Sequence, residues 1–359
     1  MLIVEAIALG ALSIPSAFAT LGMVIGVICY VEIGLIAIYT SYIIGQVKLY
    51  ITGSDICSLL FGGVSAIILR FLAIPSSFAD IAIFGYIDFA SIIIAIGITI
   101  IATGIGSANS IGGLETVNWS ALPKEDVSFS EAFVAVSNIV FAYSFATCQF
   151  SFMDEMHTPE DFTKSIWTLG ILEIVIYTIT GATIYAFVGL DVKSPAFLSA
   201  GDVVSKVAFG VALPVIFISG SINTIVAGRL IHGRIYRNSV TRYVNTPKGW
   251  ITWLSLISFI TVLAWIIAEA IPFFSDLLGI ASALFTSGFS FYWPPVMWFM
   301  LIRQGNWWSK DNLFLSIVNI FVFLFGLMVL MGGLYSTIID IRANYATGNV
   351  RGAFSCSPV

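Results

Sequence analysis

The chain has 359 residues, of which 58% are apolar and only 10% are charged, and its formal net charge is −5. An ordinary soluble domain carries about 25% charged residues, so water is not the main solvent of this chain. The apolar content suffices for about ten helices that cross a bilayer, each of about 20 residues. The composition therefore excludes a soluble enzyme and a nucleic-acid-binding protein, and it indicates an all-α polytopic membrane protein whose partner is the lipid bilayer.

Long apolar runs bounded by polar residues, Gly or Pro predict the membrane-spanning helices. We expect them at residues 2–19, 24–46, 57–74, 84–105, 132–152, 167–190, 207–228, 250–271, 277–302 and 313–339. Runs such as Ile92 to Ile101 are apolar on every face, unlike the alternating strands of a membrane β-barrel. No charge block or polar linker interrupts the series, so residues 1–359 are predicted to form a single membrane domain.

The basic residues and one glycosylation sequon predict the orientation. The loop 229–248 has no acid and contains Arg229, Arg234, Arg237, Arg242 and Lys248. By the positive-inside rule this loop is predicted to face the cytoplasm. Alternation of the helices then places residues 106–131 outside, where Asn118 begins the only sequon of the sequence, Asn-Trp-Ser. A sequon can be glycosylated only on the lumenal side, so the two signals agree.

Counting helices from that loop toward the N-terminus produces a conflict. Gln46 and Lys48 look cytoplasmic, and alternation places residues 75–83 on the same side, although only the predicted helix 57–74 separates them. One explanation is that 57–74 re-enters the membrane without crossing it, and another is that the first two helices are inverted. The third is that a helix present in relatives is absent between about residues 48 and 57.

The first predicted helix contains Gly10-Ala11-Leu12-Ser13-Ile14-Pro15. Pro15 lacks an N–H group and clashes with the preceding turn, while Gly10 adds backbone freedom, so we expect the helix to break here. Unpaired backbone at membrane depth is tolerated only where it lines a cavity, contacts a ligand or is buried in protein. Freed N–H groups can bind a carboxylate, and freed carbonyls can bind an ammonium group or a cation. The alternative is a packed proline kink.

A second break is predicted in the middle of the fifth helix, without a proline, at Phe141-Ala142-Tyr143-Ser144-Phe145. The alternative is a stripe of packed aromatic side chains. Farther along, Thr158, Pro159 and Asp161 have the pattern of a helix start, because a capping hydroxyl is followed by a proline and an acid in the first turn. A short cytoplasmic helix is therefore expected before the next crossing.

Four segments carry a resemblance to a known family. They are residues 5–18 (EAIALGALSIPSAF), 138–162 (NIVFAYSFATCQFSFMDEMHTPEDF), 189–196 (GLDVKSPA) and 265–272 (WIIAEAIP). Together they resemble the amino acid/auxin permease family, in its fungal neutral amino acid permease branch, and the resemblance covers most of the chain.

The resemblance implies the fold of the amino acid, polyamine and organocation superfamily, which has two inverted five-helix repeats, and in this family one extra helix. In this chain an incomplete first repeat would occupy about 1–105, the second repeat about 131–302, and the extra helix 313–339. Aligning the two breaks makes 57–74 the fourth helix of the family, so the resemblance implies that helix three is absent.

The resemblance also implies the site residues. Those expected to contact the backbone groups of an amino acid are Gly10, Ala11, Leu12, Ser13, Phe141, Ala142, Tyr143, Ser144 and Phe145. Ser219, Ser221 and Asn223 are implied near the position of a coupling ion. That ion is expected to be H⁺, with Na⁺ as the alternative, and no cofactor or resident metal is expected.

Acidic residues inside apolar segments are costly, at about 2.5 kcal/mol or more at a helix centre when uncompensated. Glu5 lies five residues before Gly10, where it would face a cytoplasmic vestibule or a partner, and it is a candidate for proton coupling. Glu32, Asp88 and Glu173 lie deeper in their segments, and we expect each to pair with neighbours or to be protonated.

The sequence thus predicts a secondary carrier that moves small neutral amino acids by alternating access, driven by protons. An enzyme is not expected, because there is no HExxH motif and His157 and His232 are the only histidines. The alternative is a truncated or mis-spliced permease without transport activity, or a nutrient sensor. We expect the plasma membrane, with the vacuolar membrane as the alternative, and the sequence predicts no oligomeric state.

Overall fold

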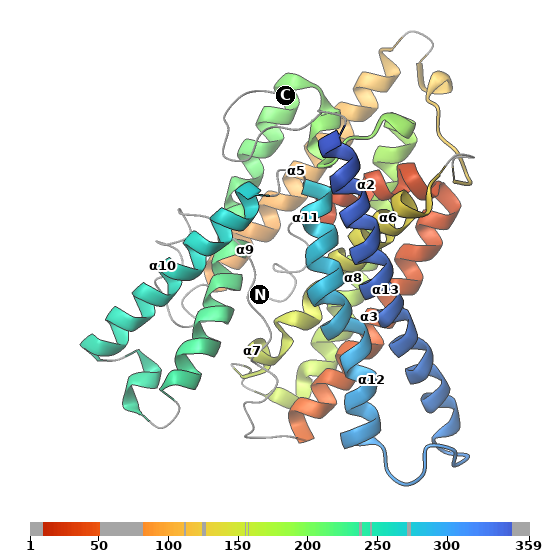
Figure 1. The fold of residues 1–359 in the computed structure, drawn as a ribbon. Coiled ribbons are helices and arrows are strands. Elements are labelled where there is room, and N and C mark those ends of the chain that lie inside the picture. Colours follow the sequence, from red (N-terminus) through yellow and green to blue (C-terminus); the bar gives the residue numbers. More distant parts are fainter. Residues whose placement is uncertain are drawn as a thin grey trace.

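The computed structural model describes residues 10–50, 82–110, 113–123, 127–154, 156, 158–236, 239–244, 246–270 and 274–346. All regular secondary structure within these ranges is helical, and most of the helices form one elongated bundle (Figure 1). The expectation of an all-α polytopic membrane protein is therefore confirmed for the described part of the chain.

Among the described residues, six helices are long and apolar enough to cross a membrane. They are α3 (Met23–Tyr50), α5 (Ala82–Ala108), α8 (Phe162–Val188), α9 (Asp202–Ile235), α10 (Pro247–Ala270) and α13 (Leu313–Ala346). Each coincides with one predicted crossing. The predicted helix 57–74 lies outside the described residues.

Two further predicted crossings are built from consecutive shorter helices. The predicted helix 132–152 is divided into α6 (Phe129–Ala142), the 3-10 turn η3 (Ser144–Thr147) and α7 (Gln149–Asp154). The predicted helix 277–302 corresponds to α11 (Phe274–Ala281), the π-helix η8 (Ser282–Tyr292), α12 (Trp293–Met297) and the π-helix η9 (Trp298–Ile302). The described part of the first predicted helix is α2 (Gly10–Leu21), which is mostly buried in the core.

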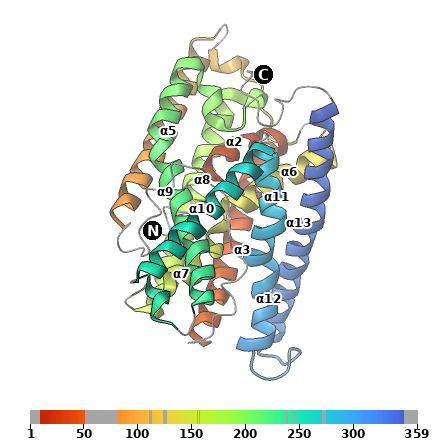
Figure 2. The same ribbon diagram turned by 60° about the vertical axis from the view of Figure 1, so that its left-hand side comes forward.

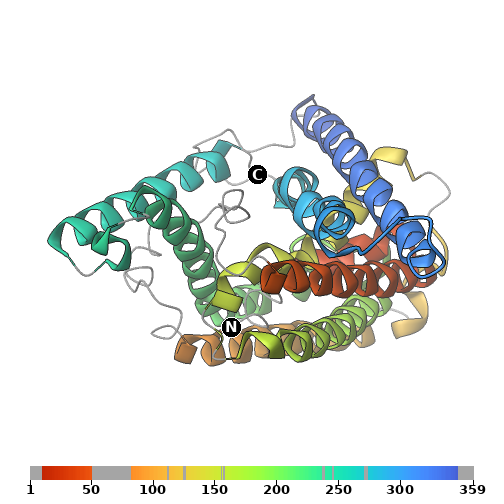
Figure 3. The ribbon, with the colours of Figure 1, turned by 90° about the horizontal axis from the view of Figure 1, so that it is seen from below.

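The bundle is arranged around α3. It contacts α2, α8 and α12, and the view along the bundle shows it between α8 and α12 (Figure 3). α13 lies at one edge, beside α6 and the α11–η9 segment (Figures 1 and 2), whereas α10 lies at another edge against α9. α2 contacts α3, α6 and α8, and these four helices hold the candidate site.

Small residues let α3 and α8 approach closely, as is usual where two helices pack in a membrane. A Cβ atom added to Gly170 of α8 would lie 2.2 Å from Cγ1 of Ile38, and one added to Gly34 of α3 would lie 2.5 Å from Cγ1 of Ile174. Each glycine therefore receives an isoleucine of the opposite helix, and the two contacts fix the register between α3 and α8.

The loop that contains the sequon is hydrogen-bonded to the start of α3 and to the end of α8, and α8 is bonded in turn to the end of α5. The N–H groups that open α3, on Met23 and Val24, donate to the carbonyls of Ser120 and Ala121 at 2.9 and 3.0 Å. Leu190, just after α8, donates to the carbonyl of Asn118 at 3.0 Å. The hydroxyl of Ser107, at the end of α5, donates to the carbonyl of Phe187. The start of α3 and the ends of α5 and α8 thus lie on the sequon side.

The positions of the sequon and the basic loop relative to each other are as predicted. α9 begins on the sequon side because only a short connection separates it from the end of α8, and its 34 residues carry it to the other side. Arg229 and Arg234 lie near that far end. The basic loop and Asn118 therefore face opposite sides of the bundle.

The helix directions also bear on the parity conflict. α3 starts on the sequon side and α5 ends there. The end of α3, at Tyr50, and the start of α5, at Ala82, therefore both lie on the side of the basic loop. Inversion of the first two helices is therefore wrong as an explanation for α3. The residues between Tyr50 and Ala82, which include the predicted helix 57–74, lie outside the described residues.

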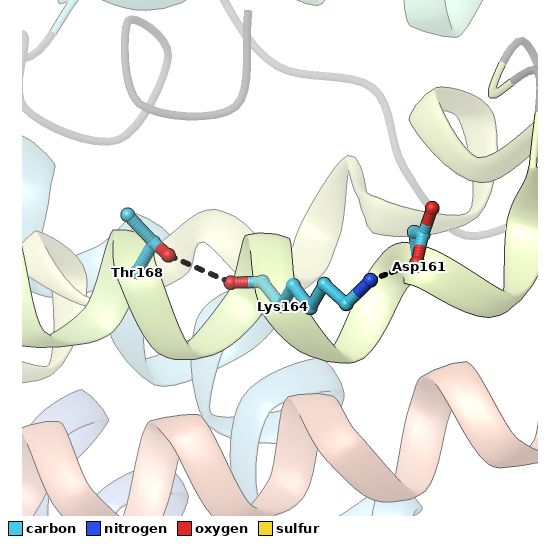
Figure 4. A network of polar contacts seen from close by, with 3 residues as sticks. All are labelled: Asp161, Lys164 and Thr168. Carbon is cyan, nitrogen blue, oxygen red and sulfur yellow. Dashed lines mark hydrogen bonds and ion pairs between the residues drawn. The ribbon is translucent and has the colours of Figure 1, made fainter.

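The helix expected before α8 is only one turn. The predicted helix start is confirmed, because the 3-10 turn η4 (Pro159–Asp161) begins at Pro159, but η4 leads directly into α8 and is not separated from it. The reason is that the buried Phe162 packs against α3 at Gly45, which continues the apolar face of α8 without a gap. Polar contacts support this first turn: Lys164 Nζ lies 2.7 Å from Asp161 Oδ1, and Thr168 donates to the carbonyl of Lys164 (Figure 4).

Replacing Gly22 by Ala is expected to destabilise the junction between α2 and α3. Gly22 has φ +80°, and a Cβ there would lie 2.5 Å from the backbone of Leu122, which cannot move aside without disturbing the sequon loop. Strain at such a position costs about 1–3 kcal/mol, so the thermal unfolding temperature of the detergent-solubilised protein should fall. Gly97→Ala is the matched control, because no atom lies within 4 Å of its added Cβ. Equal melting of both variants would contradict the assignment.

The Asn118 side chain is exposed, so this sequon is expected to be glycosylated when the protein is made in a eukaryotic host. The measurement is a shift in electrophoretic mobility that an endoglycosidase removes and that Asn118→Gln abolishes. A membrane-inserted chain without a glycan would argue against placing this loop on the lumenal side.

Candidate functional site

The central feature of the candidate site is the interruption of α6. The helix begins with a capping box, in which Ser128 and Glu131 exchange side-chain to backbone hydrogen bonds, and it ends at Ala142. Tyr143 leaves the helical conformation (φ −95°, ψ 38°), and the chain continues through η3 before α7 begins at Gln149. The predicted break at Phe141 to Phe145 is therefore confirmed. The aromatic packing proposed as its alternative is present as well, because Tyr143 and Phe145 are buried.

A tyrosine of α8 compensates for part of the hydrogen bonding that the interruption removes. The last carbonyls of a helix have no intrahelical donor, and such groups are costly in a membrane unless another group satisfies them. The hydroxyl of Tyr177 donates to the carbonyl of Ala142 at 3.2 Å, and both residues are buried. α8 thus stabilises the end of α6 directly.

The structure changes the interpretation of Pro15. α2 runs continuously from Gly10 to Leu21 through Pro15, so the prediction that Pro15 breaks the helix is wrong, whereas a break at Gly10 itself concerns the junction with residues outside the described ones. Pro15 cannot donate to the carbonyl of Ala11, but the hydroxyl of Ser13 donates to the carbonyl of Gly10 at 3.0 Å and keeps the first turn paired. Residues before Gly10 lie outside the described residues, and so does the coupling candidate Glu5.

The two predicted substrate segments meet at Gly10 and Ala142. A Cβ added to Gly10 would lie 2.7 Å from Cα of Ala142, so the backbones of α2 and α6 touch where α6 ends. The other predicted contact residues lie in the same region and are packed closely. Ala11, Leu12, Ser13, Tyr143 and Phe145 are buried, whereas Phe141 and Ser144 are partly buried. The segment is therefore closed by its own side chains in this conformation.

The three coupling-ion candidates on α9 have different surroundings. Ser219 donates to Asp88 Oδ2 of α5 at 3.4 Å, and Ser221 donates to the carbonyl of Phe217 in its own helix. Asn223 lies beside the interrupted segment, because the Cys148 thiol lies 3.8 Å from Asn223 Oδ1. Asn223 is thus the candidate that the structure brings to the break, whereas Ser219 faces α5.

The sequence did not identify a tyrosine cluster that surrounds the break. The rings of Tyr143 and Tyr177 lie 5.4 Å apart and those of Tyr143 and Tyr30 6.5 Å apart, and Phe18 stacks on Tyr30 at 5.2 Å. The buried Glu173 lies one turn before Tyr177 on α8. A signal for this cluster exists in the sequence, because Glu173 and Tyr177 are four residues apart and share one helix face.

Comparisons with known proteins identify related transporter sequences. The family described as transmembrane amino acid transporter protein matches residues 1–57 and 47–339. An N amino acid transport system protein of Neurospora crassa is 54% identical, with an alignment that covers 100% of this chain and 87% of that protein. Proteins described as transmembrane transporters from Fusarium pseudograminearum and Gibberella moniliformis are 25% and 28% identical, over 98% and 84% of this chain and 84% and 64% of their own lengths.

The alignment with the Neurospora protein bears on the absent helix. It spans 409 positions, more than the 359 residues of this chain, so that protein has residues inside the alignment that have no counterpart here. The two family matches meet at residues 47–57, which is the region where the sequence predicted that a helix is absent.

Replacing Gly10 by Leu is expected to abolish amino acid uptake while the protein still reaches the membrane. A side chain at this position must push the backbone of Ala142 away and thereby displace the interrupted segment of α6. The measurement is radiolabelled uptake normalised to the protein at the cell surface, and Gly10→Ala is expected to give a smaller loss. Gly210→Leu on α9 is the control, since no atom lies within 4 Å of its added Cβ. Normal uptake by Gly10→Leu would refute the site.

Proposed function

Because the chain belongs to the family of transmembrane amino acid transporter proteins, we propose that it is a secondary carrier of small neutral amino acids that works by alternating access and is coupled to protons. The observation that carries this proposal is the contact of α2 with α6 at the point where α6 is interrupted, between Gly10 and Ala142. Backbone groups freed at this depth of a membrane protein are tolerated where they contact a ligand.

The charges of the lining support a neutral substrate. Residues 10–21 and 132–153 contain no charged side chain, so neither segment offers an ion-pair partner for a charged substrate side chain. A charged group in a membrane interior requires such a partner. The residues of the two segments are mainly small or apolar, which suits a small apolar side chain.

The backbone can supply the groups that hold the zwitterion. In the proposed mode, the N–H groups of the first turn of α2 face the carboxylate, because the N-terminal end of a helix carries partial positive charge. The carbonyls at the end of α6 face the ammonium group, since the C-terminal end of a helix carries partial negative charge. This mode would discriminate an amino acid by its backbone groups without any charged side chain.

Closure of the site is consistent with alternating access. Tyr143 and Phe145 are buried, so a substrate can enter only after the residues around the interruption move. A closed state of this kind is one of the states that a carrier must visit, and substrate binding would shift the population between it and open states.

One observation favours a second candidate function. The alignment gap described above indicates that residues present in the Neurospora protein are absent from this chain. A chain without the corresponding helix would be a transport-inactive paralogue or a nutrient sensor that still binds an amino acid.

The proposal is tested with purified protein in liposomes. We expect a labelled small neutral amino acid to accumulate when an inward proton gradient is imposed, and we expect a protonophore to abolish the accumulation. Neutral amino acids should compete, whereas lysine and glutamate should not. A sodium gradient that drives accumulation without a proton gradient would contradict proton coupling.

A second experiment separates the two candidate functions. A restored chain, which carries the additional residues of the Neurospora protein at the gap in the alignment, is measured beside the natural chain. Binding without transport by the natural chain, together with transport by the restored one, would favour the sensor. Transport by both would favour the carrier.

A further inference from the structure

Glu173 is a fully buried acid in the membrane bundle. Its carboxyl has no hydrogen-bonding partner among the described residues. Its side chain has 0% exposure, and neither Oε1 nor Oε2 accepts a hydrogen bond from any part of the chain that the structure describes. An ionised carboxylate without a partner is very costly in such surroundings, so the group requires a proton or a cation.

Among the described residues, the elements that pack around Glu173 place no cation beside it. Lys48 lies at the far end of α3 over the Phe150 ring, and Lys164 is exposed in the first turn of α8. α8 packs against α2, α3 and α5. α2 has no titratable residue. α3 presents Tyr30, and its acid Glu32 is exposed. On α5, the exposed Tyr86 and the buried Asp88 are the titratable residues, and Asp88 accepts a hydrogen bond from Ser219.

Two tyrosines lie near Glu173 in the fold. Tyr177 follows it by one turn of α8, and the Tyr143 ring lies 5.4 Å from that of Tyr177. The hydroxyl of Tyr143 is buried and, like the carboxyl, has no hydrogen-bonding partner among the described residues. The hydroxyl of Tyr177 already donates to the carbonyl of Ala142, the last residue of α6. The remaining acids near α8, Asp161 and Asp191, are exposed at its ends.

We propose that Glu173 binds the proton that couples transport to the closing of the interrupted segment of α6. This inference rests on the proposed carrier function and assigns its proton site. The step is a protonation: the Glu173 carboxylate takes one proton from water on the entry side and becomes a neutral carboxylic acid, and it returns that proton to water on the exit side.

The neutral acid fits the closed conformation, because the enclosed Glu173 side chain then carries no charge. Loss of the proton leaves a buried carboxylate for which the described helices supply no cation, so the closed packing becomes unfavourable and water must reach the group. The proton therefore binds more tightly to the closed state than to an open one, and this difference is what a coupling ion needs in order to shift the population.

Tyr177 links the proton site to the backbone. It lies one helical turn after Glu173, its ring contacts Tyr143, and its hydroxyl holds the end of α6. A movement of Tyr143 or Tyr177 on deprotonation would release the carbonyl of Ala142, which faces the proposed substrate position.

The test uses Glu173→Gln, which keeps the volume of the side chain and resembles the protonated acid. In proteoliposomes we expect it to lose accumulation driven by a proton gradient, whereas exchange of labelled for unlabelled amino acid persists and no longer depends on pH. The wild-type protein should accumulate faster as the external pH falls. Glu173→Asp should retain part of the accumulation because it keeps a carboxyl. Glu115→Gln, at an exposed residue of η2 (Gly113–Thr116), is the matched control.

Two results would overturn the proposal. One is accumulation by Glu173→Gln with the pH profile of the wild-type protein. The other is that Glu5→Gln removes the pH dependence while Glu173→Gln keeps it, which would assign the proton to Glu5.

A spectroscopic measurement separates this proposal from the carrier function. Infrared difference spectra of the purified protein are recorded across a pH titration, and the C=O stretching band of a protonated carboxylic acid is compared between wild type and Glu173→Gln. Loss of one such band in the variant supports proton binding at Glu173 even if the protein transports no amino acid. An identical band in both proteins would overturn the proposal, whereas absence of uptake by the wild-type protein would contradict only the proposed carrier function.

Discussion

The structure depends on one constraint: a backbone polar group at membrane depth must be satisfied within the protein. α6 stops at Ala142 in the middle of the bundle, and this is possible because three neighbours surround its end. Gly10 brings the backbone of α2 into contact with Ala142, and Tyr177 of α8 donates to the carbonyl that the interruption exposes. The close packing of α3 on α8 then holds Tyr177 in place. The interruption is therefore a property of four helices together and not of α6 alone.

Much of the fold follows from the sequence because membrane helices are specified by length and hydrophobicity. The six long crossings lie where apolar runs predicted them, and the interruption of α6 lies where the sequence indicated it. Pro15 misled the prediction for a physical reason. A proline removes one hydrogen bond, here to the carbonyl of Ala11, and strains a turn, but α2 continues through Pro15 while it is buried against α6 and α8. The effect of a proline thus depends on the packing around the helix, which the sequence does not show.

The candidate site was less predictable, because its polar groups are defined by contacts between helices. Glu32, Asp88 and Glu173 look alike in the sequence, since each is an acid in an apolar run. In the structure Glu32 is exposed, Asp88 is paired with Ser219 across the contact of α5 with α9, and Glu173 is enclosed beside the break. Only the packing of helices distant in sequence distinguishes the three. The spacing of Glu173 and Tyr177 was visible in the sequence, but the partner of Tyr177, the carbonyl of Ala142, was not.

The residues that stabilise the interruption of α6 are present in this chain. The residues that the chain lacks relative to the Neurospora protein are therefore not needed for these contacts. The contacts of α2 with α6, of α2 with α8 and of α3 with α8 are all made by described helices on either side of residues 51–81. The interruption, its tyrosine cluster and Glu173 are thus held together by helices that this chain retains. In the proposed mode, binding of an amino acid and of a proton would require only these elements, because the groups proposed to contact each ligand belong to α2, α6 and α8. Transport requires in addition that the closed segment opens to each side in turn, and a helix absent from the wall of the site would alter that opening before it altered binding. On the proposed function, a chain without that helix would therefore be able to lose transport while it retains binding.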